Sequence, residues 1–129
     1  MQHPYKSVYE QVGQEGFERL LAAFYRRVAV DPVLRPLYPE AELGGAERRL
    51  RMFLVQYFGG PTTYSVERGQ PRLRMRHMPF AIGQAERDAW IVAMFGALDE
   101  VAIPEPAYST MKEYFETAAD FMINAAPIR

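Results

Sequence analysis

Apolar side chains recur at helical spacing, three or four residues apart, along most of the chain. In the first such segment Phe17, Leu20 and Leu21 share one face, and Phe24 and Val28 continue it. No series of residues alternates between apolar and polar as strands do. The pattern predicts an all-α domain of four helices, at residues 15–30, 46–58, 86–101 and 106–126.

Glycine and proline residues divide these segments. Asp31-Pro32 ends the first, Gly59-Gly60-Pro61 the second, and Pro127 the fourth. The connection 59–84 shows no clear period and room for at most one short helix. Long connections of this kind usually carry function. The chain of 129 residues otherwise reads as a single domain, 1–129.

The amino-acid composition excludes several classes of function. Hydrophobic residues make up 49%, and the net charge of −1 provides no field that would attract nucleic acid. The absence of cysteine excludes disulfides, thiolate nucleophiles and cysteine metal sites. The longest apolar stretch, 89–98, is about half of what a membrane span requires. With no signal peptide in view, we expect a soluble, cytoplasmic protein without a membrane span.

Two histidines are present, and His3 lies next to the terminus. His77, just before Met78-Pro79, is either a half-buried capping residue or a metal ligand. Zinc needs three or four protein ligands and a non-haem iron triad needs two histidines. Haem needs only one axial imidazole from the protein. The rich aromatic content, 13%, suits a flat ligand as well as a core.

Arginines and aromatic donors leave two interpretations open. The arginines of the second helix and of the long connection either bind the two haem propionates or form a solvated basic patch. Tyr25, Tyr38 and Trp90 either fill the core or place three donors around a ligand. The arginines concerned are Arg48, Arg49, Arg51, Arg68, Arg72, Arg74 and Arg76.

The chain resembles the group II truncated haemoglobins over nearly its whole length. The stretches that carry the resemblance are FYRRVAVDPVLRPLYP (24–39), AERRLRMFLVQYFGGPTTYS (46–65), RGQPRLRMRHMPF (68–80) and ERDAWIVAM (86–94). The resemblance implies a globin-like, two-over-two helical sandwich holding haem b. In it the first and second long helices form one antiparallel pair, and the third and fourth form the other.

The resemblance also implies roles for single residues. His77 is expected to be the proximal iron ligand, and Tyr25, Tyr38 and Trp90 to face the ligand side. Ala46 stands where many globins carry a distal His or Gln. The expected pocket wall is Leu50, Phe53 and Leu54, and the residues expected near the propionates or haem edge are Arg49, Tyr64 and Arg76.

We therefore expect a five-coordinate iron that binds O2, and also NO and CO. Oxygen transport and chemistry on O2, such as NO oxidation or a peroxidase-like activity, both remain open, as does a reductase partner. The chain is expected to be a monomer or homodimer. One alternative is a cofactor-free helical interaction module; a sensor is disfavoured because no output domain is attached.

Overall fold

The computed structural model describes residues 6–69 and 82–123; His77 and its neighbours, and His3, lie outside these ranges. Within them the chain is helical and contains no strand, so the predicted all-α class is confirmed. The elements are α1 (Val8–Val30), the short 3-10 helix η1 (Arg35–Leu37), α2 (Gly44–Tyr57), α3 (Thr63–Arg68), α5 (Gln84–Glu100) and α6 (Ala107–Met122).

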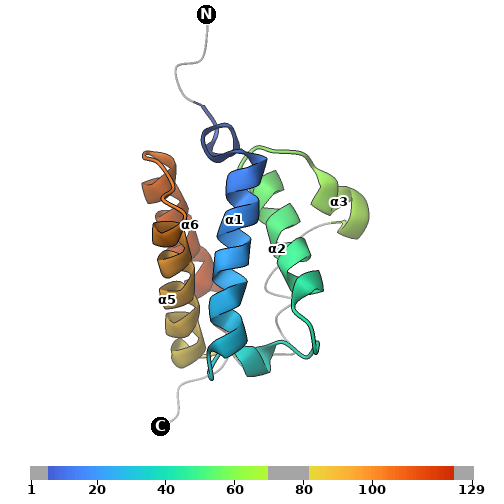
Figure 1. The fold of residues 1–129 in the computed structure, drawn as a ribbon, viewed down its shortest axis with the longest axis vertical. Coiled ribbons are helices and arrows are strands. Elements are labelled where there is room, and N and C mark those ends of the chain that lie inside the picture. Colours follow the sequence, from blue (N-terminus) through green and yellow to red (C-terminus); the bar gives the residue numbers. More distant parts are fainter. Residues whose placement is uncertain (1–5, 70–81, 124–129) are drawn as a thin grey trace, which may run out of the picture.

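The long helices form two antiparallel pairs. Helix α1 lies between α2 on one side and α5 on the other, and α6 runs beside α5 (Figure 1). Helices α1 and α2 run in opposite directions, as do α5 and α6 (Figure 1). The pairing expected from the resemblance, first with second and third with fourth, is confirmed.

Helix α1 begins seven residues earlier than the periodicity predicts. Ser7 caps it: the Glu10 N–H donates to Ser7 Oγ at 3.1 Å, and the Ser7 N–H donates to Glu10 Oε1 at 2.9 Å. Gly13 interrupts the helix with a φ of 78°, a conformation that costs glycine little. The predicted start at Glu15 therefore marks the resumption of the helix after this kink.

The first turn of α1 binds the ends of two other helices. The Tyr9 N–H donates to the Phe58 carbonyl at 2.9 Å, and a Cβ at Gly60 would lie 2.7 Å from the Tyr9 ring, so a larger residue could not sit there. Gln11 Oε1 accepts from the Ala107 N–H at 3.0 Å. That contact satisfies one of the free donors at the start of α6.

The core lies where α1 meets α2, α5 and α6. The apolar face predicted for the first helix is fully buried, from Phe17 to Val28. Helix α5 contributes Met94 and Leu98, and α6 contributes Met111 and Phe115. No helix among the described residues combines the length and apolar character that crossing a membrane requires.

Helices α1 and α5 approach closely at Gly96. A Cβ at this position would lie 2.9 Å from Arg27 Nε, so the guanidinium passes over the bare backbone of α5. Arg27 Nη1 then donates to Glu100 Oε1 at 2.8 Å and to the Ala23 carbonyl at 3.1 Å. The glycine thus makes room for the ion pair that joins the two layers.

Candidate functional site

A cavity of about 460 Å³ opens between the two helical pairs. This volume falls in the range of roughly 300–1,000 Å³ typical of small-molecule sites. Residues from α1, the loop after η1, α2, α3, α5 and α6 form its walls. The lining residues are Tyr25, Leu34, Leu37, Tyr38, Pro39, Glu40, Ala46, Arg49, Leu50, Phe53, Leu54, Tyr64, Arg68, Ile82, Glu86, Arg87, Trp90, Tyr114, Phe115, Ala118, Ala119 and Met122.

The structure brings together every predicted site residue that it describes. Residues expected on the ligand side, in the pocket wall and at the haem edge all line this one cavity: Tyr25, Tyr38, Ala46, Arg49, Leu50, Phe53, Leu54, Tyr64 and Trp90. The two remaining predictions, Arg76 and His77, lie in 70–81, outside the described residues, as do Arg72 and Arg74.

Tyr25 is buried and lines the cavity. Its ring meets Phe24 at a centroid distance of 4.9 Å and Tyr38 at 5.7 Å, both edge to face. The Tyr25 hydroxyl donates to the Ala46 carbonyl over 3.4 Å, a long distance for this kind of bond. The phenol is therefore held in place by ring packing, and its hydroxyl also interacts with the hydroxyl of Tyr38.

The phenols of Tyr25 and Tyr38 both remain protonated in the neutral range. Burial raises the pKa of Tyr25 well above its ordinary value, and the adjacent Tyr38 raises it further. Burial also raises the pKa of Tyr38; the neighbouring Tyr25 opposes this shift and the charge of Glu40 adds to it. Each phenol can thus donate a hydrogen bond to a group in the cavity.

Trp90 offers a third donor from the first half of α5. Its ring packs against Phe24 at 5.3 Å and Phe115 at 5.6 Å between centroids, with planes inclined by 61° and 65°. These contacts fix the indole between the two helical pairs. No acceptor for its N–H lies among the residues that the structure describes, and indole nitrogen can only donate.

Tyr114 is a lining residue that the sequence did not single out for the site. Its ring lies against that of Tyr57, with centroids 4.2 Å apart and planes tilted by 34°, and meets Phe58 edge to face at 5.3 Å. Burial and the nearby Tyr57 raise the pKa of Tyr114 to about 12. Its place beside the apolar stripe of α6 was visible in the sequence, but no signal distinguished it from a core residue.

Charged pairs stand at the edge of this largely apolar cavity. Arg49 Nη2 donates to Glu40 Oε1 at 2.7 Å, and Arg87 Nε donates to Asp120 Oδ1 at 2.8 Å. Arg48, next to Arg49, instead pairs with the exposed Glu67 and does not line the cavity. Among the described arginines of this set, Arg49 and Arg68 line the cavity and Arg48 does not.

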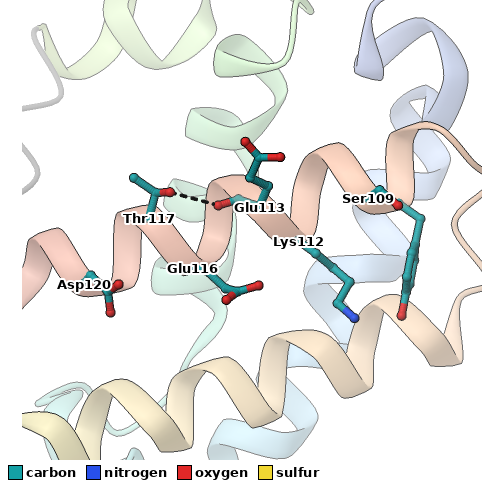
Figure 2. A pocket seen from close by; sticks show the side chains of 7 residues that line it. Ser109, Lys112, Glu113, Glu116, Thr117 and Asp120 are labelled. Atoms are coloured by element: carbon teal, nitrogen blue, oxygen red, sulfur yellow. Dashed lines mark hydrogen bonds between the residues drawn. The ribbon is translucent and has the colours of Figure 1, made fainter.

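A second hollow is lined by side chains of α6 (Figure 2). Polar and charged side chains line it, including Lys112, Glu113 and Glu116, and most of them are exposed. Thr117 Oγ1 donates to the Glu113 carbonyl within the same helix at 3.1 Å (Figure 2). None of the predicted site residues lies here, so the cavity between the helical pairs is the candidate site.

Comparison with known proteins gives a consistent picture. The bacterial-like globin family matches residues 7–124. The group 2 truncated hemoglobin YjbI of Bacillus subtilis is 37% identical over 124 residues, which are 96% of this chain and 93% of that protein.

Solved structures agree with this match. A thermostable hemoglobin from Thermobifida fusca is 53% identical with a TM-score of 0.91, over 95% of this chain and all of the other (100%). A truncated oxygen-avid haemoglobin from Bacillus subtilis is 38% identical with a TM-score of 0.88, over 92% of this chain and 100% of that one. The described fold is thus the two-over-two sandwich of truncated globins.

Proposed function

Because this chain belongs to the bacterial-like globin family, as a group II truncated haemoglobin that binds haem b and small gaseous ligands, we propose that it retains O2 and supports chemistry on it, such as the oxidation of NO. The observation that carries the proposal is that three hydrogen-bond donors, Tyr25, Tyr38 and Trp90, line a single cavity. The oxygen-avid character named for the Bacillus subtilis relative agrees with it.

The residues of the cavity fit a haem. Apolar and aromatic side chains such as Leu54, Phe53 and Tyr64 suit the faces of a flat macrocycle, and Arg49 at the edge suits a carboxylate. When bound, haem would supply an iron that can bind a diatomic gas. His77 is the residue that we propose as the protein's ligand to that iron.

The distal side chains would act as hydrogen-bond donors to a polar gas. Electron density shifts toward the oxygen atoms of O2 when it binds, and donors already fixed in a dry pocket stabilise that charge. Tyr25 and Tyr38 stay protonated because burial raises their pKa, and Phe24 and Phe115 hold the Trp90 ring between them. Ala46 provides no donor of its own side chain, so retention rests on these three residues.

Slow O2 release would favour chemistry over delivery. Oxidation of NO by O2 to nitrate takes one electron, which bound, reduced haem would supply. A reductase or a small-molecule reductant would then have to return that electron. Fast release would instead suit oxygen transport.

A single-turnover experiment tests this proposal. Haem-loaded, reduced protein is saturated with O2 and mixed with an equal amount of NO, and nitrate is measured. We expect one nitrate per haem and a rate of O2 dissociation much slower than the reaction with NO. O2 release that outpaces the reaction, with no nitrate formed, would rule out this role and favour delivery.

A further inference from the structure

Glu40 lies in the loop after η1, and several hydrogen bonds hold the backbone of this loop in place. Arg35 donates to three carbonyls of this loop: from Nη1 to Tyr38 at 2.8 Å, and from Nη2 to Glu40 at 2.7 Å and Ala41 at 3.1 Å. The Arg35 N–H is itself bonded to the Asp31 carbonyl at 2.9 Å. The backbone of Glu40 is thereby tied to the end of α1.

The Glu40 side chain reaches Arg49 on α2. Oε1 accepts from Arg49 Nη2 at 2.7 Å, and each side chain is 37% exposed, so the pair is half-buried. A bond from its own backbone N–H, and then Arg49, lower the pKa of Glu40. The carboxylate is therefore charged at neutral pH and attracts the guanidinium.

Gly45, one helical turn before Arg49 in α2, leaves space for the Arg49 side chain. A Cβ on Gly45 would lie 3.1 Å from Arg49 Nη1, closer than most real contacts. Glycine at position 45 thus lets the guanidinium lie along the start of α2, where Glu40 meets it. Both Glu40 and Arg49 line the cavity.

In the pair of Glu40 and Arg49, several polar atoms at the edge of the cavity have no hydrogen-bond partner among the described residues. Arginine has five N–H donors, and within the described residues only Nη2 of Arg49 is engaged. Glu40 Oε2 is buried without a hydrogen-bond partner among the same residues. A buried oxygen without a partner costs stability, which indicates that the carboxylate is placed here for something other than stability.

We propose that Glu40 is a positioning residue, which holds Arg49 at the edge of the cavity as the contact for a carboxylate of the bound ligand. The inference rests on the proposed haem site, since the haem propionates are the carboxylates concerned. Glu40 contributes to haem retention only through Arg49. A guanidinium already held in place loses less conformational entropy when it binds a carboxylate.

The test measures the rate of haem loss from the full chain to an excess of apomyoglobin. Breaking one charge-assisted bond to the ligand makes Arg49→Met lose haem about tenfold faster, and Glu40→Ala about fivefold faster. In the Arg49→Met background Glu40→Ala has no further effect. Glu67→Ala, which breaks the neighbouring Arg48 pair outside the cavity, is the control and leaves the rate unchanged.

A second ligand separates this role from a merely structural one. Haem dimethyl ester lacks both carboxylates, so neither Glu40→Ala nor Arg49→Met changes its rate of loss. Glu40→Gln keeps an acceptor for Arg49 but removes the charge, and accelerates loss of haem b about threefold.

Three results would overturn the inference while leaving the haem site intact: slower haem loss in Glu40→Ala, equal effects with the dimethyl ester, or an undiminished effect of Glu40→Ala in the Arg49→Met background. Failure of the haem site itself would be seen differently, as no Soret band in the wild-type chain.

Discussion

The rings of Tyr25 and Tyr38 meet edge to face, 5.7 Å between centroids and inclined by 78°, in the wall of the cavity. Tyr25 comes from the last third of α1 and Tyr38 follows η1, so residues 13 positions apart form one part of that wall. Burial raises the pKa of both phenols, which keeps them protonated at neutral pH.

The first prediction concerns O2 release. Tyr25→Phe and Trp90→Phe each remove one donor from the cavity and should speed O2 dissociation by about 5- to 150-fold, which corresponds to a hydrogen bond of roughly 1–3 kcal/mol. Stopped-flow displacement of O2 by CO measures the rate. Tyr57→Phe is the matched control, because Tyr57 is 54% exposed and does not line the cavity. Unchanged rates in both cavity variants would refute the proposed donor network.

The second prediction concerns the contact between α1 and α5. Gly96→Ala places a methyl carbon 2.9 Å from the present position of Arg27 Nε, so the guanidinium must shift and its bond to Glu100 is weakened. The displaced group is the end of a flexible, partly exposed side chain, so the cost is that of the weakened ion pair, about 0–1 kcal/mol. Urea unfolding of haem-loaded protein should therefore show a lower midpoint for this variant than for Gly44→Ala.

Gly44→Ala is the control for that experiment. A Cβ at Gly44 would meet nothing within 4 Å, and the residue stands at the start of α2. Replacing a helical glycine by alanine usually stabilises by about 0.5–1 kcal/mol, so the midpoint should stay the same or rise. Equal midpoints for Gly96→Ala and Gly44→Ala would show that Arg27 moves aside without cost.

The third prediction follows from Tyr114. Its pKa is raised to about 12 in the fold by burial and by the nearby Tyr57, whereas an unfolded chain ionises near pH 10. Below pH 10 both states are protonated and the contribution is fully present. Between about pH 10 and 12 only the unfolded state loses its proton, so stability falls as pH rises.

Tyr114→Phe removes part of this dependence. Urea midpoints measured at intervals from pH 9 to 11.5 should fall less steeply for the variant than for the wild type. Tyr25, whose pKa is raised in the same direction, keeps a remaining slope. Identical slopes in the two proteins would mean that Tyr114 ionises equally in the folded and unfolded states.

Helical periodicity predicted the long helices because their buried faces repeat along the chain. It missed the first seven residues of α1, since Gly13 breaks the period and the start of the helix is held by Ser7 and Glu10 rather than by an apolar stripe. It did not predict η1 either, whose three residues are too few to show a period.

The residues of the site likewise include some that the sequence predicted and some that it did not. Residues on the regular faces of α1, α2 and α5, among them Tyr25, Leu54 and Trp90, could be placed from the sequence and the family resemblance. Glu40 could not be placed from the sequence. It lies in a loop without periodic pattern, and only the folded structure shows that the loop brings its carboxylate to Arg49. Tyr114 looked like any aromatic residue of a core.

Haem binding and the role of His77 are tested most directly by an absorption titration of the wild-type chain and of His77→Ala with haem b. We expect a Soret band that saturates at one haem per wild-type chain, and no stable haem complex in the variant. A folded wild-type chain that develops no such band would contradict haem binding. A variant that retains a normal band would contradict the assignment of His77 as the iron ligand.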